Sequence, residues 1–182
     1  LADWWGKHGF GLLRENASGI VLGRDLPVAV TVPARAAMHA LGVELAGLLR
    51  AGDVIIATGE LGAGKTTLAR GIGEGLGVEG PVISPTFVLS RIHPSRGGGP
   101  DLVHVDAYRM AGADELADID LDATLPGSVT LVEWGEGIAE WLSDERLEID
   151  IDREIGDEAR RVTLTGTGPR WAGALEALRR NP

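Results

Sequence analysis

Eight residues, Gly59-Glu-Leu-Gly-Ala-Gly-Lys-Thr66, constrain the fold of this 182-residue chain more than any other feature. They fit the pattern of Gly, four residues, Gly, Lys and Thr that cradles nucleotide phosphates. An apolar, β-branched run at residues 53–58 precedes them, and a segment of helix formers at residues 66–76 follows and ends at Gly77. We therefore predict a strand, a phosphate-binding loop and a helix in succession, because this context separates a true site from a chance glycine-rich turn.

Each fixed position of this loop has a physical role. The glycines permit backbone conformations that let successive N–H groups converge on phosphate oxygens, and the following helix adds its positive N-terminal end. Lys65 would contact the β and γ phosphates, and the Thr66 hydroxyl would complete a magnesium shell. The predicted phosphate-binding residues are Gly59, Glu60, Leu61, Gly62, Ala63, Gly64, Lys65, Thr66 and Thr67.

The rest of the chain alternates predicted strands and helices. We expect strands at residues 87–92, 102–105, 129–132, 147–151 and 161–164, and helices at residues 34–49, 113–117, 135–142 and 170–180. This alternation indicates an α/β, P-loop NTPase-like three-layer sandwich around a mainly parallel sheet. The short spacing of the last two strands indicates an antiparallel C-terminal hairpin. We expect one domain over residues 28–182 and an N-terminal extension of unknown structure over residues 1–27.

Composition excludes several functions. The 17 basic and 27 acidic residues give a net charge of −10, which disfavours a dedicated nucleic-acid binder. Cysteine is absent, so the chain has no disulfide, thiolate zinc site or cysteine nucleophile. No apolar run approaches the roughly 20 residues that cross a bilayer, and no secretion signal is recognisable at the start. We expect a cytoplasmic protein that does not contact a membrane.

Two acidic residues end predicted strands. Asp106 follows Leu-Val-His-Val, and Glu133 follows Val-Thr-Leu-Val. In parallel strands both carboxylates would emerge beside the phosphate loop, where they can order magnesium or water. Each could instead be a loop carboxylate that caps a helix. His104 is expected to be a core or hydrogen-bonded histidine. The predicted catalytic residues are Lys65, Asp106 and Glu133.

Four segments in this order resemble the TsaE family, formerly YjeE: Gly59-Glu-Leu-Gly-Ala-Gly-Lys-Thr-Thr67, Ser84-Pro-Thr-Phe87, His104-Val-Asp-Ala-Tyr-Arg109 and Val132-Glu-Trp-Gly-Glu136. The resemblance spans approximately residues 28–178. It implies the ATPase component of the bacterial machinery that makes threonylcarbamoyladenosine (t6A) in tRNA. It also implies ATP and Mg²⁺ as ligands, TsaB and TsaD as partner proteins, and only indirect involvement with tRNA.

The same resemblance implies roles for individual residues. Thr66 and Glu133 match the magnesium-associated positions, and Asp106 matches an acidic residue needed for ATP turnover. Trp134 matches a tryptophan that adjoins the active site, although an isolated tryptophan would by default fill core volume.

Two further nucleotide contacts come from the resemblance. Ser84 and Thr86 lie in a segment that resembles a GTPase switch, in which contacts to the terminal phosphate order a loop. From the residues alone, the same segment could be a turn before a strand. Arg160 is a weaker candidate for a nucleotide contact.

The leading hypothesis is Mg²⁺-dependent ATP hydrolysis, slow without partners, that gates or resets a TsaB–TsaD transferase complex. One alternative is a small-molecule kinase in which residues 91–100 form a lid and Arg91 and Arg96 clamp phosphate. The other is a nucleotide-gated binding module that does not hydrolyse ATP.

Overall fold

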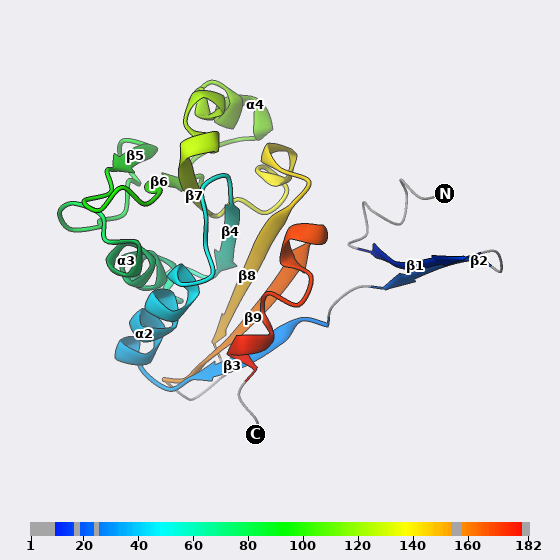
Figure 1. Ribbon diagram of the computed structural model, residues 1–182. Coiled ribbons are helices and arrows are strands. Elements are labelled where there is room, and N and C mark those ends of the chain that lie inside the picture. Colours follow the sequence, from blue (N-terminus) through cyan, green and yellow to red (C-terminus); the bar gives the residue numbers. More distant parts are fainter. Residues whose placement is uncertain (1–9, 17–18, 24–25, 154–157, 180–182) are drawn as a thin grey trace.

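The computed structural model describes residues 10–16, 19–23, 26–153 and 158–179. A seven-stranded sheet with the order β3-β9-β8-β4-β7-β6-β5 forms its centre (Figure 1). The strands are β3 (Val28–Val32), β4 (Val54–Gly59), β5 (Ser90–His93), β6 (Asp101–Asp106), β7 (Ser128–Glu133), β8 (Arg146–Arg153) and β9 (Arg160–Thr167).

The sheet is mixed, and the prediction of a mainly parallel sheet is correct only for its centre. Strands β8, β4, β7 and β6 pair in parallel, as βαβ-type connections require. The outer pairs β3–β9, β9–β8 and β6–β5 are antiparallel. The predicted antiparallel C-terminal hairpin is present as β8–β9. Strand β3 adds one of these antiparallel pairs. It precedes the phosphate loop in the sequence, yet it pairs with β9, the last strand.

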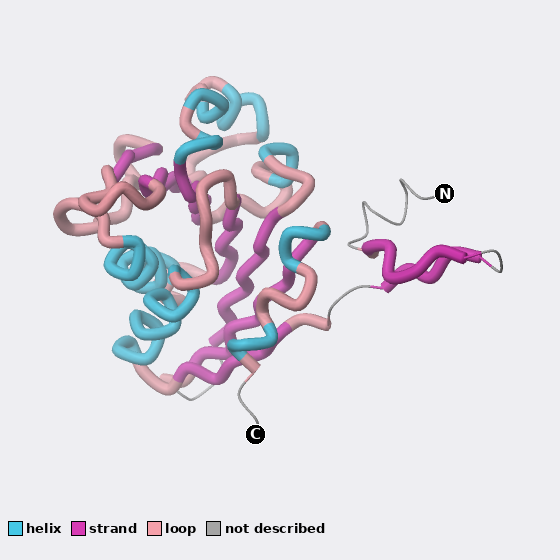
Figure 2. Tube along the Cα trace, in the orientation of Figure 1, coloured by secondary structure: helices cyan, strands magenta, loops and turns pink. Residues whose placement is uncertain are grey.

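Two helices, α2 (Arg35–Ala46) and α3 (Lys65–Leu76), pack against each other beside one face of the sheet (Figures 1 and 2). Glycines bring their backbones close together. A Cβ placed on Gly71 would lie 2.1 Å from the carbonyl oxygen of His39, and one on Gly42 would lie 2.4 Å from that of Leu68. The larger apolar core lies beneath these helices and fixes α3 against the sheet.

The opposite face of the sheet carries a smaller core. Alternation along β4 sends Ile55 and Ala57 into the larger core and Ile56 into the smaller one. Helix α4 (Ala113–Ala117) and the 3-10 turn η1 (Leu121–Ala123) contribute Leu116 and Leu121 to it. Two more short turns follow, η2 (Leu125–Gly127) and η3 (Glu140–Leu142). Helical segments therefore cover both faces, although this second layer consists of single turns.

Two predicted helices are absent as continuous elements. Within residues 135–142 only η3 forms, because Trp134 and Gly137 adopt left-handed backbone angles with φ of 62° and 74°. Within residues 170–179 the chain forms η4 (Pro169–Trp171) and η5 (Glu176–Leu178), separated by Gly173 at φ 68°. Residue 180 lies outside the described residues. Local helix-forming composition is overridden here by backbone reversals.

The predicted strand at residues 87–92 begins later than expected. The amides of Val88 and Leu89 both donate to the Pro85 carbonyl, and Leu89 has φ 64°. This tight turn occupies the start of the predicted strand, so β5 runs only from Ser90 to His93.

The N-terminal extension contains a two-stranded antiparallel sheet of β1 (Gly11–Asn16) and β2 (Gly19–Gly23), separate from the main sheet. Residues 1–9, 17–18 and 24–25 of the predicted extension lie outside the described residues. Within the described part of the chain, no helix has the length and apolar character needed to cross a membrane.

Candidate phosphate-binding site

The predicted phosphate loop connects β4 to α3. Gly59, Gly62 and Gly64 all have positive φ, and a Cβ on Gly59 would lie 2.5 Å from the Ile151 carbonyl oxygen. Helix α3 begins at Lys65 with neither a capping side chain nor an acidic residue in its first turn. Because the first N–H groups of a helix have no partner within the helix, this end of α3 is suited to an anion.

Lys65 places a buried cation in this loop. Its side chain is 5% exposed, and Nζ donates to the carbonyl oxygens of Gly59 and Glu60 at 2.6 and 3.0 Å. The same nitrogen lies 3.6 Å from the centroid of the Trp134 ring. Burial lowers the pKa of Lys65, while the carboxylates of Glu133 and Asp106 act in the opposite direction. A phosphate group would supply the negative charge that this position favours.

Glu133 connects the loop to the centre of the sheet. It is 2% exposed, and its Oε2 accepts a hydrogen bond from the Thr66 hydroxyl at 3.2 Å. Its Oε1 lies 2.8 Å from Nε2 of His104, which is fully buried. Since a carboxylate only accepts, Nε2 of His104 carries the hydrogen. Both oxygens of Glu133 are thereby oriented from different elements.

Asp106 is adjacent to Glu133, because β6 and β7 run in parallel with these two residues in register. Its Oδ2 accepts hydrogen bonds from the hydroxyls of Ser84 and Thr86 at 3.0 and 2.6 Å. Its Oδ1 accepts one from the Tyr108 amide at 3.0 Å. Asp106 thus anchors the segment that resembles a switch.

These groups surround one cavity of about 260 Å³. Its lining residues are Leu61, Gly62, Gly64, Lys65, Thr66, Thr67, Ser84, Thr86, Asp106, Tyr108, Glu133 and Trp134. All three predicted catalytic residues and both predicted metal ligands are brought together here. Of the predicted contacts, Gly59, Glu60, Ala63 and Arg160 are not among the lining residues.

Arg160 lies on the other side of the loop. It lines a second cavity of about 310 Å³ together with Ala63, Arg35 and Met38. The two cavities share Gly62, Gly64 and Thr67, so the loop separates them. Arg91 and Arg96, the suggested kinase clamp, line neither of them.

Two residues beside the site have contacts that the sequence did not specify. His104 is buried and hydrogen-bonded, as expected, and its partner is Glu133. The available signal was the alternation of side chains along a strand, which places His104 and Asp106 on one face of β6. Tyr108 lines the cavity, with its ring centroid 5.0 Å from that of Trp134. Trp134 lines the cavity and also packs against the smaller core.

Comparison with known proteins places this geometry in a family. A family model described as threonylcarbamoyl adenosine biosynthesis protein TsaE matches residues 32–162. The chain belongs to the TsaE family. The matched range contains the phosphate loop, both buried carboxylates, Trp134 and Arg160, whereas the N-terminal two-stranded sheet precedes it.

Individual members of the TsaE family are similar over most of their length. A protein of Streptomyces coelicolor named tRNA threonylcarbamoyladenosine biosynthesis protein TsaE is 62% identical over 141 residues, which are 75% of this chain and 95% of that protein. The protein of the same name from Bacillus subtilis is 44% identical over 137 residues, with 75% and 84% covered. The crystal structure of Bacillus subtilis YdiB has a TM-score of 0.69 at 35% identity and covers 84% of this chain and 94% of YdiB.

Proposed function

We propose that this TsaE-family chain is a Mg²⁺-dependent ATPase that supports t6A formation in tRNA by gating or resetting a TsaB–TsaD transferase complex. One observation carries the catalytic part of the proposal. The Thr66 hydroxyl and the buried Glu133 carboxylate meet beside Lys65 at the phosphate loop. The names of the similar proteins support the pathway.

The oxygens of Thr66 and Glu133 fit Mg²⁺. This ion prefers oxygen ligands in an octahedron, in which neighbouring ligand oxygens lie about 2.9 Å apart. The 3.2 Å separation of Thr66 Oγ1 and Glu133 Oε2 is close to that spacing. These two residues would hold Mg²⁺, with phosphate and water oxygens completing the shell. When bound, Mg²⁺ neutralises charge that develops on the phosphate oxygens.

The remaining chemistry comes from the chain itself. Lys65 and the amides at the start of α3 stabilise the negative charge of the phosphates. Asp106 accepts hydrogen bonds at the edge of the same cavity, so it can orient and polarise the attacking water. Glu133 binds metal in this assignment because it is the carboxylate that contacts Thr66.

The second cavity is suited to the nucleoside. It continues from the phosphate loop and presents the side chains of Arg35, Met38 and Arg160. An apolar Met38 and two guanidinium groups can pack against a purine ring and contact ribose or phosphate oxygens. The preference for ATP over GTP rests on the family, since no guanine-specific Asn-Lys-x-Asp segment is present.

The partner-binding part rests on the mouth of the phosphate cavity. Leu61 and Tyr108 line it and are 77% and 55% exposed, and Phe87, the residue after the lining residue Thr86, is 84% exposed. Phe87 follows directly after Thr86, which is held by Asp106. A change in the terminal phosphate would therefore move an exposed aromatic group that TsaB or TsaD could contact. The net charge of −10 agrees with indirect involvement of tRNA.

The deciding experiment is phosphate release from Mg-ATP by the wild-type chain and by Lys65→Ala, each alone and with TsaB, TsaD and tRNA. We expect slow release that the partners stimulate and that falls at least 100-fold in the variant. Phosphate transferred to a small molecule would support a kinase instead. Nucleotide-dependent association with the partners without any phosphate release would support a non-hydrolysing switch.

A further inference from the structure

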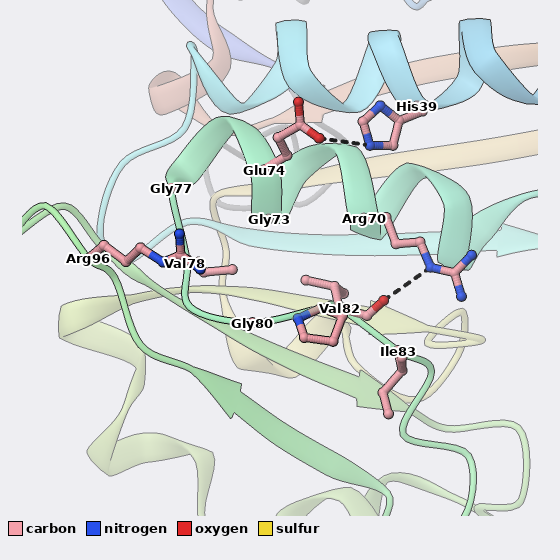
Figure 3. A pocket seen from close by; sticks show the side chains of 11 residues that line it. His39, Arg70, Gly73, Glu74, Gly77, Val78, Gly80, Val82, Ile83 and Arg96 are labelled. Carbon is pink, nitrogen blue, oxygen red and sulfur yellow. Dashed lines mark hydrogen bonds and ion pairs between the residues drawn. The ribbon is translucent and has the colours of Figure 1, made fainter.

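A third cavity, of about 540 Å³, lies between α3 and residues 77–83 (Figure 3). Two of its charged side chains are held by the chain itself. Nε of Arg70 donates to the Val82 carbonyl at 3.0 Å, and Glu74 pairs with His39 at 3.3 Å. Among the described residues, no buried side-chain nitrogen or oxygen that lacks a hydrogen bond lines this cavity. Two such atoms lie instead in strands β5 and β6.

These two atoms are Nε2 of His93 and Nδ1 of His104. His93 is 4% exposed, and His104 is fully buried. Buried polar atoms in native proteins are nearly all hydrogen-bonded, to other protein groups or to ordered water. Each of the two nitrogens therefore requires a partner. The proposed ATPase mechanism assigns no role to His93.

Strand register places both histidines in one row with Glu133. His93 on β5 is paired with Leu102 on β6, and His104 follows two residues later, so both imidazoles lie on the same face of the sheet. His104 is in turn paired with Leu131 on β7, two residues before Glu133. The row therefore runs diagonally across three neighbouring strands, from the outer strand β5 to the proposed metal ligand.

The distance between the two rings excludes a direct hydrogen bond. Their centroids are 6.5 Å apart, with 38° between the ring planes. A direct hydrogen bond requires about 3 Å between the nitrogens, closer than centroids 6.5 Å apart permit. One water that forms two hydrogen bonds of about 2.8 Å can join nitrogens up to about 5.6 Å apart. A single water is therefore the smallest partner that satisfies both nitrogens.

The hydrogen positions determine the direction of this link. Nε2 of His104 carries a hydrogen, because Oε1 of Glu133 only accepts. When the ring is neutral, Nδ1 of His104 is then an acceptor that needs a donor. Burial lowers the pKa of His93 from 6.5, so His93 is neutral near pH 7. Its Nε2 can carry the single hydrogen of the neutral ring and act as the donor.

We propose that His93 is a positioning residue for the nucleotide site: one buried water accepts from its Nε2–H and donates to Nδ1 of His104, which fixes the tautomer of His104 and the orientation of Glu133. Loss of such outer partners of a metal-binding carboxylate typically weakens metal affinity 10- to 100-fold. The link between the histidines rests on their geometry alone, whereas its effect on metal binding rests on the proposed function.

The link is tested by ¹⁵N NMR of the imidazoles in the full chain without metal or nucleotide. In the wild type we expect a nuclear Overhauser effect from a long-lived water to the Nε2 hydrogen of His93. His93→Phe should move the Nδ1 signal of His104 to higher frequency, because that nitrogen loses its donor. His93→Gln retains an N–H donor and should restore the wild-type signal. The matched control His39→Gln alters a histidine outside the row and should leave the signal unchanged.

The effect on the site is measured as Mn²⁺ affinity, by electron paramagnetic resonance, in the same variants. We expect His93→Phe to weaken Mn²⁺ binding about 10-fold. His93→Gln and the control His39→Gln should stay within about 3-fold of the wild type. Rescue by the glutamine separates a hydrogen-bonding role of His93 from simple packing.

Three results would overturn the proposal. Absence of the water signal, or an Nδ1 signal of His104 that is the same in His93→Phe and the wild type, would exclude the link. Equal losses of Mn²⁺ affinity in His93→Phe and His93→Gln would show that His93 acts by packing alone. Wild-type Mn²⁺ affinity in His93→Phe would show that the link does not position Glu133. If the wild type binds no Mn²⁺, the proposed metal site fails, while the NMR comparison still decides the link, so the two failures are distinguishable.

Discussion

Thr66 and Glu133, 67 residues apart in the sequence, meet where α3 begins, and the threonine hydroxyl donates to Oε2 of the glutamate at 3.2 Å. The contact joins the phosphate loop to the end of β7. It brings together, from α3 and β7, the two oxygen atoms that we propose as Mg²⁺ ligands.

The first prediction concerns Glu133→Gln. The substitution preserves the shape of the side chain but removes the charge that attracts Mg²⁺. We expect nucleotide affinity without Mg²⁺ to stay within about 3-fold of wild type, while Mg²⁺ no longer strengthens binding and phosphate release falls at least 100-fold. Fluorescent-nucleotide titration with and without Mg²⁺ measures this. Mg²⁺ enhancement equal to that of wild type would remove Glu133 from the metal site.

The second prediction concerns His104, which positions Glu133. His104→Leu leaves the buried Oε1 of Glu133 without its donor, and loss of such a partner typically weakens metal affinity 10- to 100-fold. We expect that loss in Mn²⁺ binding followed by electron paramagnetic resonance. His104→Gln should partly restore affinity, because its amide can replace Nε2 as donor. Equal Mn²⁺ affinity in both variants and the wild type would reduce His104 to core packing.

The third prediction separates Asp106 from Glu133. Asp106→Asn removes the negative charge that would polarise water but leaves Thr66 and Glu133 in place. We expect Mg-ATP binding within about 3-fold of wild type, together with turnover reduced by about 100-fold or more. Single-turnover measurements with equilibrium binding test both parts. A parallel loss of Mg²⁺ affinity would show that Asp106 shares the metal.

Much of the site was predictable because its signals are local. The phosphate loop was predicted from its glycine pattern, which lies between a β-branched run and a segment of helix-forming residues. Strand ends located Asp106 and Glu133, since the carboxyl ends of parallel strands meet at one edge. His104 was harder to assign, because a buried histidine in a strand resembles core until its partner on β7 is known.

The missed elements depend on tertiary context. Residues 135–142 have a helix-like composition, but the left-handed Trp134 turns the chain so that its ring contacts Lys65. Strand β3 pairs with β9, which follows it in the sequence only after five other strands and helices α2, α3 and α4, and no local pattern predicts such a pair. The cavity lined by His39, Arg70 and Arg96 is also formed by residues from separate elements, so no local sequence pattern predicts it.

The fourth prediction concerns acid stability. His93 is buried, and burial lowers its pKa from 6.5, with smaller contributions from His104 and Arg91. Below about pH 6.5 the unfolded chain binds a proton at His93 that the folded chain does not. This difference lowers the free energy of unfolding as the pH falls, by at most about 1.4 kcal/mol per pH unit. His93→Phe should flatten the dependence between pH 7.5 and 5.5, measured by urea unfolding. At pH 8, the difference in unfolding free energy between His93→Phe and the wild type measures the change in packing. If the variant keeps the wild-type dependence of unfolding free energy on pH, the dependence does not come from His93.

The last prediction tests the close approach of α2 and α3. Replacing glycine by alanine within a helix normally stabilises it by about 1 kcal/mol. At Gly71 the added Cβ would lie 2.1 Å from the His39 carbonyl, so the helices must separate. We expect Gly71→Ala to lower the free energy of unfolding by about 2 kcal/mol in urea. Gly97→Ala, at a position with open space around it, should change the free energy of unfolding by less than about 1 kcal/mol.

Because α3 also carries Lys65 and Thr66, Gly71→Ala should weaken nucleotide binding as well. A stable variant with unchanged nucleotide binding would show that the position of α3 does not depend on this contact.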